Sequence, residues 1–129
     1  MIKRIMSIFL LCSLFLFIGM GAYAETLADP VFLQAIANLQ QSKEVTFSLM
    51  TNYSVDSIRI TSCTLQKKVD GIWTTDQLLP APSDEDQGLV YSSTISYSSY
   101  IVNSGTYRIK YIAEADGHSI TRYSNSRTF

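Results

Sequence analysis

The side chains able to support catalysis in this 129-residue chain are few and widely spaced. His118 is the only histidine, and it directly follows Asp116 and Gly117. A serine hydrolase needs a histidine that is oriented by a carboxylate and placed beside a nucleophilic serine. The chain has many serines but no G-x-S-x-G nucleophile motif. We therefore interpret His118 as a residue that flanks a turn, and we predict no catalytic residue.

The sequence also predicts no metal site and no cofactor. Beyond residue 24, Cys63 and His118 are the only cysteine and the only histidine, which excludes an ordinary four-ligand zinc site. The run Asp84-Glu85-Asp86 is the only carboxylate cluster, and it lacks the twelve-residue pattern and the glycine of a calcium loop. We interpret it as a solvated acidic loop.

The N-terminal segment has the three parts of a secretory signal. A short, positively charged start precedes an uncharged, largely apolar stretch over residues 5–18. Ala22 and Ala24 then have the small-x-small spacing of a cleavage site, and acidic Glu25 follows them. A retained membrane anchor is the alternative, because the segment is about as long as the ~20 residues that span a bilayer. The cleavage site favours removal after Ala24.

We therefore predict a signal-peptide helix over residues 1–24 and one exported domain over residues 25–129, secreted or associated with the cell surface. Removal of the signal leaves eight basic and eleven acidic residues, a formal charge of −3. That charge argues against a nucleic-acid partner, and it offers no polybasic patch for a membrane. Cys12 leaves with the signal. Cys63 alone cannot form an internal disulfide, so we interpret it as a small buried hydrophobic residue.

Apolar and polar residues alternate with a period of two through most of the exported domain, which is typical of β-strands. Strands are predicted over residues 45–49, 58–69, 72–78, 89–101, 106–115 and 118–128. The apolar parity changes between Ile60 and Cys63, so a β-bulge is expected near Thr61 or Ser62. Prolines and acidic residues predict a loop over residues 79–87.

Two Asp-Gly pairs predict tight hairpins, because type I′ turns need positive φ at both central residues. Across Asp70-Gly71, Lys68 is expected opposite Trp73, where an ammonium over an indole ring contributes ~0.5–1 kcal/mol. Across Asp116-Gly117, a two-residue loop places Tyr123 opposite Lys110, whereas a three-residue loop turns Tyr123 inward.

Residues 26–42 fit either a helix or a strand. Asp29-Pro30 resembles a helix start, with aspartate as the cap and proline in the first turn. An antiparallel sheet needs a first strand to cover its edge, which favours a strand over residues 36–41 after at most a turn or two of helix. The pattern as a whole predicts an all-β fold, an antiparallel immunoglobulin-like β-sandwich of about six or seven strands.

The stretch Leu65–Trp73 reads LQKKVDGIW, and it resembles the LQKK-x-x-G-x-W signature of small secreted proteins of Gram-positive bacteria. Those proteins are similar to immunoglobulin-like sandwiches and carry a later G-x-Y-R-x-K strand, which Gly105–Lys110 matches. The resemblance covers roughly residues 57–115. It implies a fold and an exported location, but no activity. Tyr107 in addition resembles the tyrosine corner of immunoglobulin-like domains.

Trp73, Tyr100 and Tyr123 are the candidate surface-binding residues. Tyrosine and serine together are typical of adaptable recognition surfaces, and equally of ordinary solvated sheet faces. Our leading hypothesis is an exported, non-catalytic binding module for an unknown protein or glycan ligand. The alternatives are a secreted structural or self-associating protein and a small exported hydrolase.

The signal assignment predicts that the exported protein begins at Glu25. N-terminal sequencing of protein released by a host that expresses the full chain should read Glu-Thr-Leu-Ala. Ala24→Lys should leave the signal attached, because the peptidase accepts only small side chains at that position. Exported wild-type protein that still begins at Met1 would contradict the assignment.

Overall fold

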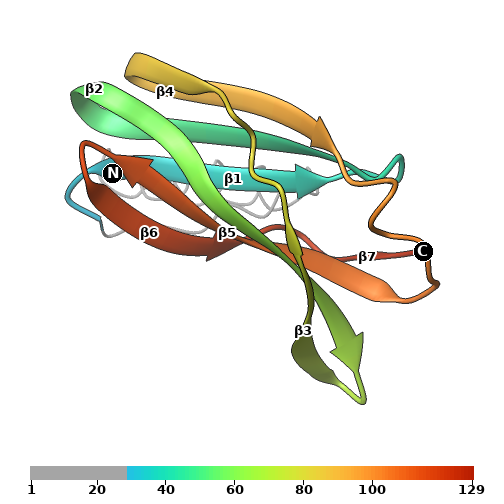
Figure 1. The fold of residues 1–129 in the computed structure, drawn as a ribbon. Helices are drawn as coiled ribbons and strands as arrows, with labels where there is room; N and C mark the ends of the chain where they lie inside the picture. The colour runs from blue at the N-terminus through green and yellow to red at the C-terminus, as the bar shows by residue number, and fades with distance from the viewer. Residues whose placement is uncertain (1–28) are drawn as a thin grey trace, which may run out of the picture.

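The computed structural model describes residues 29–129. The predicted signal helix and the cleavage residues Ala22, Ala24 and Glu25 lie outside this range. Within it, seven strands form one antiparallel sheet with no helix, which confirms the predicted all-β class (Figure 1). The strands are β1 (Phe32–Leu39), β2 (Glu44–Val69), β3 (Ile72–Leu79), β4 (Glu85–Ser96), β5 (Thr106–Ala115), β6 (His118–Tyr123) and β7 (Arg127–Thr128).

The 26-residue strand β2 organises the sheet, because four other strands pair with it. Its first half pairs with β1 and its second half with β3 and β5, whereas β4 pairs with β2 from Glu44 to Arg59. β6 and β7 pair with β5. Figure 1 shows β2 crossing the molecule from the part of the sheet that contains β1 and β4 to the part that contains β5 and β6. The two strands predicted over residues 45–49 and 58–69 are therefore one.

A bulge lets the second half of β2 keep its apolar residues on the inside. Ile60 pairs with Ala113 and Ser62 with Ile112, so Thr61 is the extra residue, as predicted. Ile60 and Cys63 consequently both face inward, with exposures of 3% and 1%. The pairing of β2 with β4 shifts register as well, on both sides of Val55, in the stretch that links the two halves.

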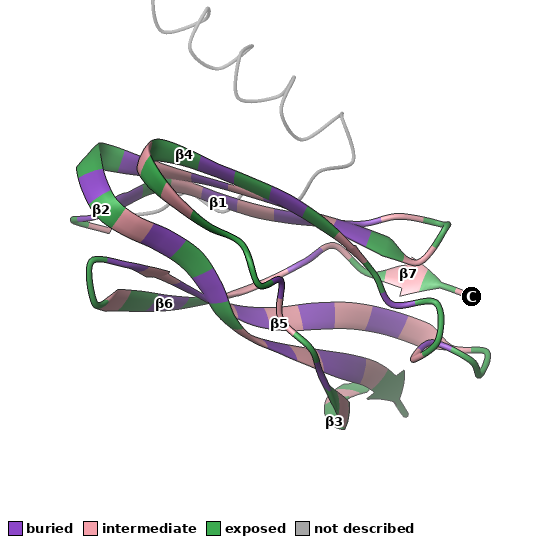
Figure 2. Cartoon of the chain, turned by 45° about the horizontal axis from the view of Figure 1, so that its top comes forward, coloured by how far each residue is buried: buried purple, intermediate pink, exposed green. Residues whose placement is uncertain are grey.

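Large aromatic rings fill the core between the two parts of the sheet. Phe47, in the first half of β2, contacts Tyr111 of β5 edge to face, with ring centroids 5.2 Å apart. Such a pair adds ~0.5–1.5 kcal/mol beyond the area that it buries. Figure 2 shows that burial alternates along β5, whose odd-numbered residues are buried from Tyr107 to Ala115.

Cys63 is buried within this core as a free thiol, as predicted. Burial raises the pKa of the thiol to about 11, although a hydrogen bond with Tyr97 lowers it. The group therefore stays protonated at neutral pH and packs as a small apolar side chain. The Tyr97 hydroxyl donates a hydrogen bond to the carbonyl oxygen of Pro80 at 2.7 Å, which pins the loop before β4.

The described part of residues 26–42 contains strand and no helix, so the helical alternative is wrong in this range. The Asp29 carboxylate does accept hydrogen bonds from the amides of Val31 and Phe32, as a helix cap would. The chain then enters β1, which starts earlier than the strand predicted over residues 36–41. The reason is tertiary: every second residue from Ala35 to Leu39 is buried by pairing with β2, which a helix would prevent.

The loop predicted over residues 79–87 is shorter than expected. β4 already begins at Glu85, because Glu85 and Asp86 pair with Arg59 and Ile58 in the middle of β2. The acidic run is therefore mostly strand and not loop, although Asp84 and Glu85 are exposed to solvent as predicted. Asp84, the residue before β4, accepts a hydrogen bond from the Ser93 hydroxyl at 2.9 Å.

Two strands end earlier than the sequence analysis predicted. The strand predicted to Ile101 ends at Ser96, where the amides of Tyr100 and Ile101 bond to the carbonyl of Tyr97 and close a turn. The strand predicted over residues 118–128 is split into β6 and β7. Asn125 lies between these two strands. Its side chain forms hydrogen bonds of 2.7 and 3.0 Å with the backbone of Leu39.

Tyr107 ties the start of β5 to the preceding turn. Its hydroxyl donates to the carbonyl oxygen of Asn103, four residues upstream, at 3.0 Å. This is the hydrogen bond that a tyrosine corner makes. The ring itself is 2% exposed.

Tyr107→Phe should lower the free energy of unfolding by ~0.5–1.5 kcal/mol, because the variant keeps the ring but loses one hydrogen bond to a partly buried carbonyl. Urea denaturation measures this change. Tyr53→Phe is the matched control, since Tyr53 is 50% exposed and should change stability by less than ~0.5 kcal/mol. Equal stability of both variants would show that the corner contributes nothing.

Candidate functional site

Strands β3, β2, β5 and β6 lie side by side in this order and share an outer face. Residues directly opposite each other in a sheet project to the same side. The pairing of Gln66 with Arg108, of Lys68 with Trp73 and of Lys110 with Tyr123 therefore builds one surface from four strands. We call it the cationic face, and it consists of Gln66, Lys68, Trp73, Arg108, Lys110 and Tyr123.

The two Asp-Gly hairpins bring these residues together. Asp70 and Gly71 have φ of 51° and 79°, and Asp116 and Gly117 have φ of 48° and 81°. Both loops thus contain two residues with positive φ, as predicted. The second loop pairs Ala115 with His118, so the register along β6 turns Tyr123 outward instead of inward.

Arg108 lies between two aromatic rings at the centre of the cationic face. Its guanidinium carbon is 4.5 Å from the centroid of the Trp73 ring and 4.2 Å from that of Tyr123. Lys68 adds a second cation, with Nζ 5.7 Å from the Trp73 ring centroid, as the predicted hairpin pair requires. Each such contact is worth ~0.5–1 kcal/mol at an exposed site. Through these ring contacts, Arg108 of β5 stabilises the positions of β3 and β6.

One in-plane hydrogen bond fixes the orientation of the guanidinium. Nε of Arg108 donates to Oε1 of Gln66 at 2.7 Å. Gln66 is only 9% exposed although it lies on the outer face. Its amide oxygen thus has a charged donor, which a buried polar group needs.

Of the three residues predicted for a binding surface, the structure brings two together. Trp73 and Tyr123 meet through Arg108. Tyr100 lies apart, in the turn after β4, where its ring contacts Tyr97 and its carbonyl accepts a hydrogen bond from Gln77. Arg108 was not selected from the sequence, although it is the arginine of the G-x-Y-R-x-K stretch and falls on the polar parity of its strand.

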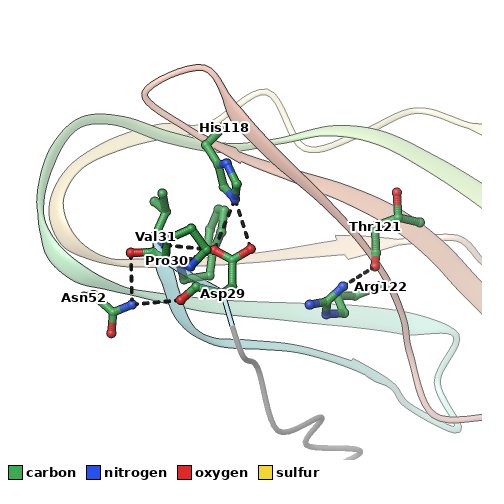
Figure 3. A network of polar contacts seen from close by, with 8 residues as sticks. Asp29, Pro30, Val31, Asn52, His118, Thr121 and Arg122 are labelled. Atoms are coloured by element: carbon green, nitrogen blue, oxygen red, sulfur yellow. Dashed lines mark hydrogen bonds and ion pairs between the residues drawn. The ribbon is translucent and has the colours of Figure 1, made fainter.

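His118 pairs with a carboxylate, and the pair anchors the start of β1 (Figure 3). Its Nε2 lies 3.1 and 3.0 Å from the two carboxylate oxygens of Asp29. Asn52 donates from its side chain to the carbonyl oxygens of Asp29 and Pro30. These contacts fasten the segment before β1 to the hairpin between β5 and β6 and to the first half of β2.

This pair gives a structural explanation for the only histidine. The imidazole is oriented by a carboxylate, as in a hydrolytic triad, but no serine hydroxyl is hydrogen-bonded to it within residues 29–129. Burial raises the pKa of Asp29, but hydrogen bonds from the Phe32 amide, from His118 and from the Val31 amide outweigh that effect, so the pKa is lowered overall.

In the part of the chain that the structure describes, no three His, Cys, Asp or Glu residues are grouped so that they could hold a metal ion. The same residues contain no helix that is long and apolar enough to cross a membrane. Comparisons of the chain with protein-family models, with curated proteins and with solved structures find no match. The cationic face is therefore interpreted from its own geometry.

Asp29→Asn should lower the free energy of unfolding by ~1–2 kcal/mol at pH 6, because it removes a partly buried charge-assisted hydrogen-bond acceptor. The folded pKa of Asp29 lies below its ordinary value of 3.8, so the unfolded chain takes up the proton first as the pH falls. The stabilisation is complete above pH 3.8 and is lost as the pH falls through the folded pKa.

Urea denaturation of both proteins at pH 6 and at pH 2.5 measures this difference, which should be smaller at the lower pH. Asp76→Asn is the control, because Asp76 is exposed. The assignment fails if Asp29→Asn is as stable as the wild type at pH 6, or if the gap is unchanged at pH 2.5.

Proposed function

We propose that this chain is an exported, non-catalytic binding protein that holds a protein or glycan ligand on the cationic face. The observation that carries the proposal is the position of Arg108 between Trp73 and Tyr123. A guanidinium that contacts two rings and donates to Gln66 loses little further freedom when a ligand arrives, so its remaining donors are preorganised. Arginine, tryptophan and tyrosine are also the residues in which binding hot spots are enriched.

The proposal includes an immunoglobulin-like β-sandwich over residues 25–129. The contact between Phe47 and Tyr111, across the two parts of the bent sheet, supports a two-layered core. The hydrogen bond from Tyr107 to Asn103 supports the tyrosine corner of that class. In this class a sheet face is a rigid platform, and the side chains on it can form a recognition surface.

Export, and the relationship to small secreted proteins of Gram-positive bacteria, belong to the same proposal. The charged start, the apolar stretch and the Ala22-Tyr23-Ala24 cleavage site support a removable signal. The LQKK-x-x-G-x-W and G-x-Y-R-x-K stretches support the relationship. Lys68, Trp73, Arg108 and Lys110 of these stretches lie on the cationic face. The remaining lysine, Lys67, has the opposite parity and lies over the ring of Tyr107.

A structural or self-associating protein is the second candidate function. The observation that favours it is β3, which pairs only with β2 within the described residues and so has a free edge. Ile72 and Leu78 on this strand are 66% and 77% exposed. Exposed apolar edge strands pair readily with other chains. Sedimentation that shows a monomer at high concentration would exclude this candidate.

The binding proposal is tested with the full chain, exported by an expression host and purified in the form that accumulates. Wild-type protein is screened on glycan arrays and against extracts of cell wall and host tissue. For any ligand found, Arg108→Ala should weaken binding by at least about tenfold, because it removes the centre of the face. Arg59→Ala is the control, since Arg59 lies elsewhere on the same sheet and pairs with Glu114.

Retention of the wild-type melting temperature to within a few degrees shows that the variants are folded. Wild-type affinity of Arg108→Ala would move the binding site away from the cationic face. A wild-type protein that binds nothing in these screens would count against a binding function altogether.

A further inference from the structure

The charges on the cationic face point to the chemistry of its ligand, an inference that rests on the proposed function. We infer that the face binds a glycan that carries carboxylate, phosphate or sulfate groups along its chain. Three features carry the inference: cations that form no ion pair within residues 29–129, two guanidinium nitrogens with no acceptor among the same residues, and a polar surrounding surface.

The cations on this face form no ion pair in the described chain, although the exposed Asp70 stands two residues from Lys68 in the hairpin turn. Lys68, Arg108 and Lys110 form no ion pair within residues 29–129, whereas Arg59 on the same sheet is paired with Glu114 at 3.0 Å. This is notable in a chain whose formal net charge is −1. An unpaired cationic surface on an acidic protein attracts anions locally in spite of the net charge.

The charges are separated along β5. Arg108 and Lys110 lie near its start, whereas Glu114 lies near its end and Asp116 follows in the turn. Four residues of extended chain separate Lys110 from Glu114, roughly 13 Å, and eight separate Arg108 from Asp116, roughly 27 Å. Both distances exceed the Debye length of about 8 Å at physiological ionic strength, so these two acidic groups do little to neutralise the cationic end.

The Nη edge of the half-buried Arg108 has the geometry of an oxyanion receptor. The rings of Trp73 and Tyr123 lie on the guanidinium, and Gln66 takes the Nε–H. No group in residues 29–129 accepts a hydrogen bond from the two Nη atoms. Two parallel N–H donors on a planar fork match the two oxygens of a carboxylate, phosphate or sulfate.

The spacing of the cations suits a chain of anions better than a single one. Arg108 and Lys110 are two residues apart on one strand, which is about 7 Å. Lys68 lies on the adjacent strand, two residues beyond the partner of Arg108. The three cations thus form an open row across two strands, and an extended polymer with repeated acidic groups can contact all of them.

The rest of this surface favours a glycan over a protein. Thr64 lies opposite Lys110, and the hydroxyl of Thr106 is hydrogen-bonded to that of Thr128 at 2.8 Å, so the neighbouring positions offer hydroxyl groups. The buried core of a protein interface is more apolar than its rim and is depleted in charged residues. The two rings of the cationic face contact the guanidinium. Among the described residues on the same side of these four strands, Leu78 is the single large apolar side chain that is highly exposed.

The test uses the exported full chain and four defined probes in a surface-binding assay. The probes are polygalacturonate, heparin, neutral dextran and poly-L-glutamate. We expect binding to one or both acidic glycans, little binding to dextran, and weaker binding to poly-L-glutamate. Affinity should fall several-fold between 50 and 200 mM NaCl, because the contacts are ionic.

Variants link the binding to the face. Arg108→Lys keeps the charge but loses the planar fork, and it should weaken binding about tenfold. Lys68→Gln and Lys110→Gln should each weaken it about threefold to tenfold, and Arg59→Gln should leave it unchanged. The two lysine variants keep the test decisive if substitutions of Arg108 impair folding.

Several results would overturn the inference. Dextran bound as tightly as the acidic glycans, with loss in Arg108→Lys, would refute the oxyanion ligand but retain the proposed binding face. Preference for poly-L-glutamate would replace the glycan with an acidic protein. No binding to any probe would also refute the inference, while the array and extract screens would still decide the proposed function separately.

Discussion

The continuity of β2 is the constraint on which the other contacts depend. One strand of 26 residues pairs with β1 and β4 at its start and with β3 and β5 at its end. Because the same backbone serves both parts of the sheet, the bend in β2 sets how closely those parts approach each other. The Thr61 bulge keeps the apolar residues inside after the bend. The contact of Phe47 with Tyr111, and the burial of Cys63 without a disulfide, follow from that geometry.

The cationic face depends on the same strand through two tight turns. Asp70-Gly71 returns the chain along the outer edge of β2, and Asp116-Gly117 returns it along the outer edge of β5. Each turn sets a register, and each register brings one aromatic ring to the outer face. Arg108 lies on β5, between the strands that carry the two rings, and it contacts both rings. A face built by backbone pairing in this way is rigid before any ligand arrives, which is the physical basis of the proposed function.

Parts of this site were accessible from the sequence because they depend on short-range rules. The pair of Lys68 with Trp73 follows from a two-residue loop, and the outward position of Tyr123 follows from the second loop. Arg108 was missed because its importance comes from two rings 35 and 15 residues away in the chain, on different strands. Tyr100 was placed on a strand by its parity, but a turn closed by the carbonyl of Tyr97 removes it from the sheet.

Local signals in the sequence were sufficient for the all-β class, the antiparallel pairing, the Thr61 bulge and both hairpins, because alternation and turn residues act over a few positions. Long-range pairing decided the rest. β1 replaces a possible helix because β2 buries its alternate residues, and β4 begins early because Glu85 and Asp86 find partners on β2. The partnership of His118 with Asp29, 89 residues apart, likewise exists only once the sheet has formed. Which strands become neighbours is a property of the whole chain, since each pairing becomes favourable only when the others bury the same core.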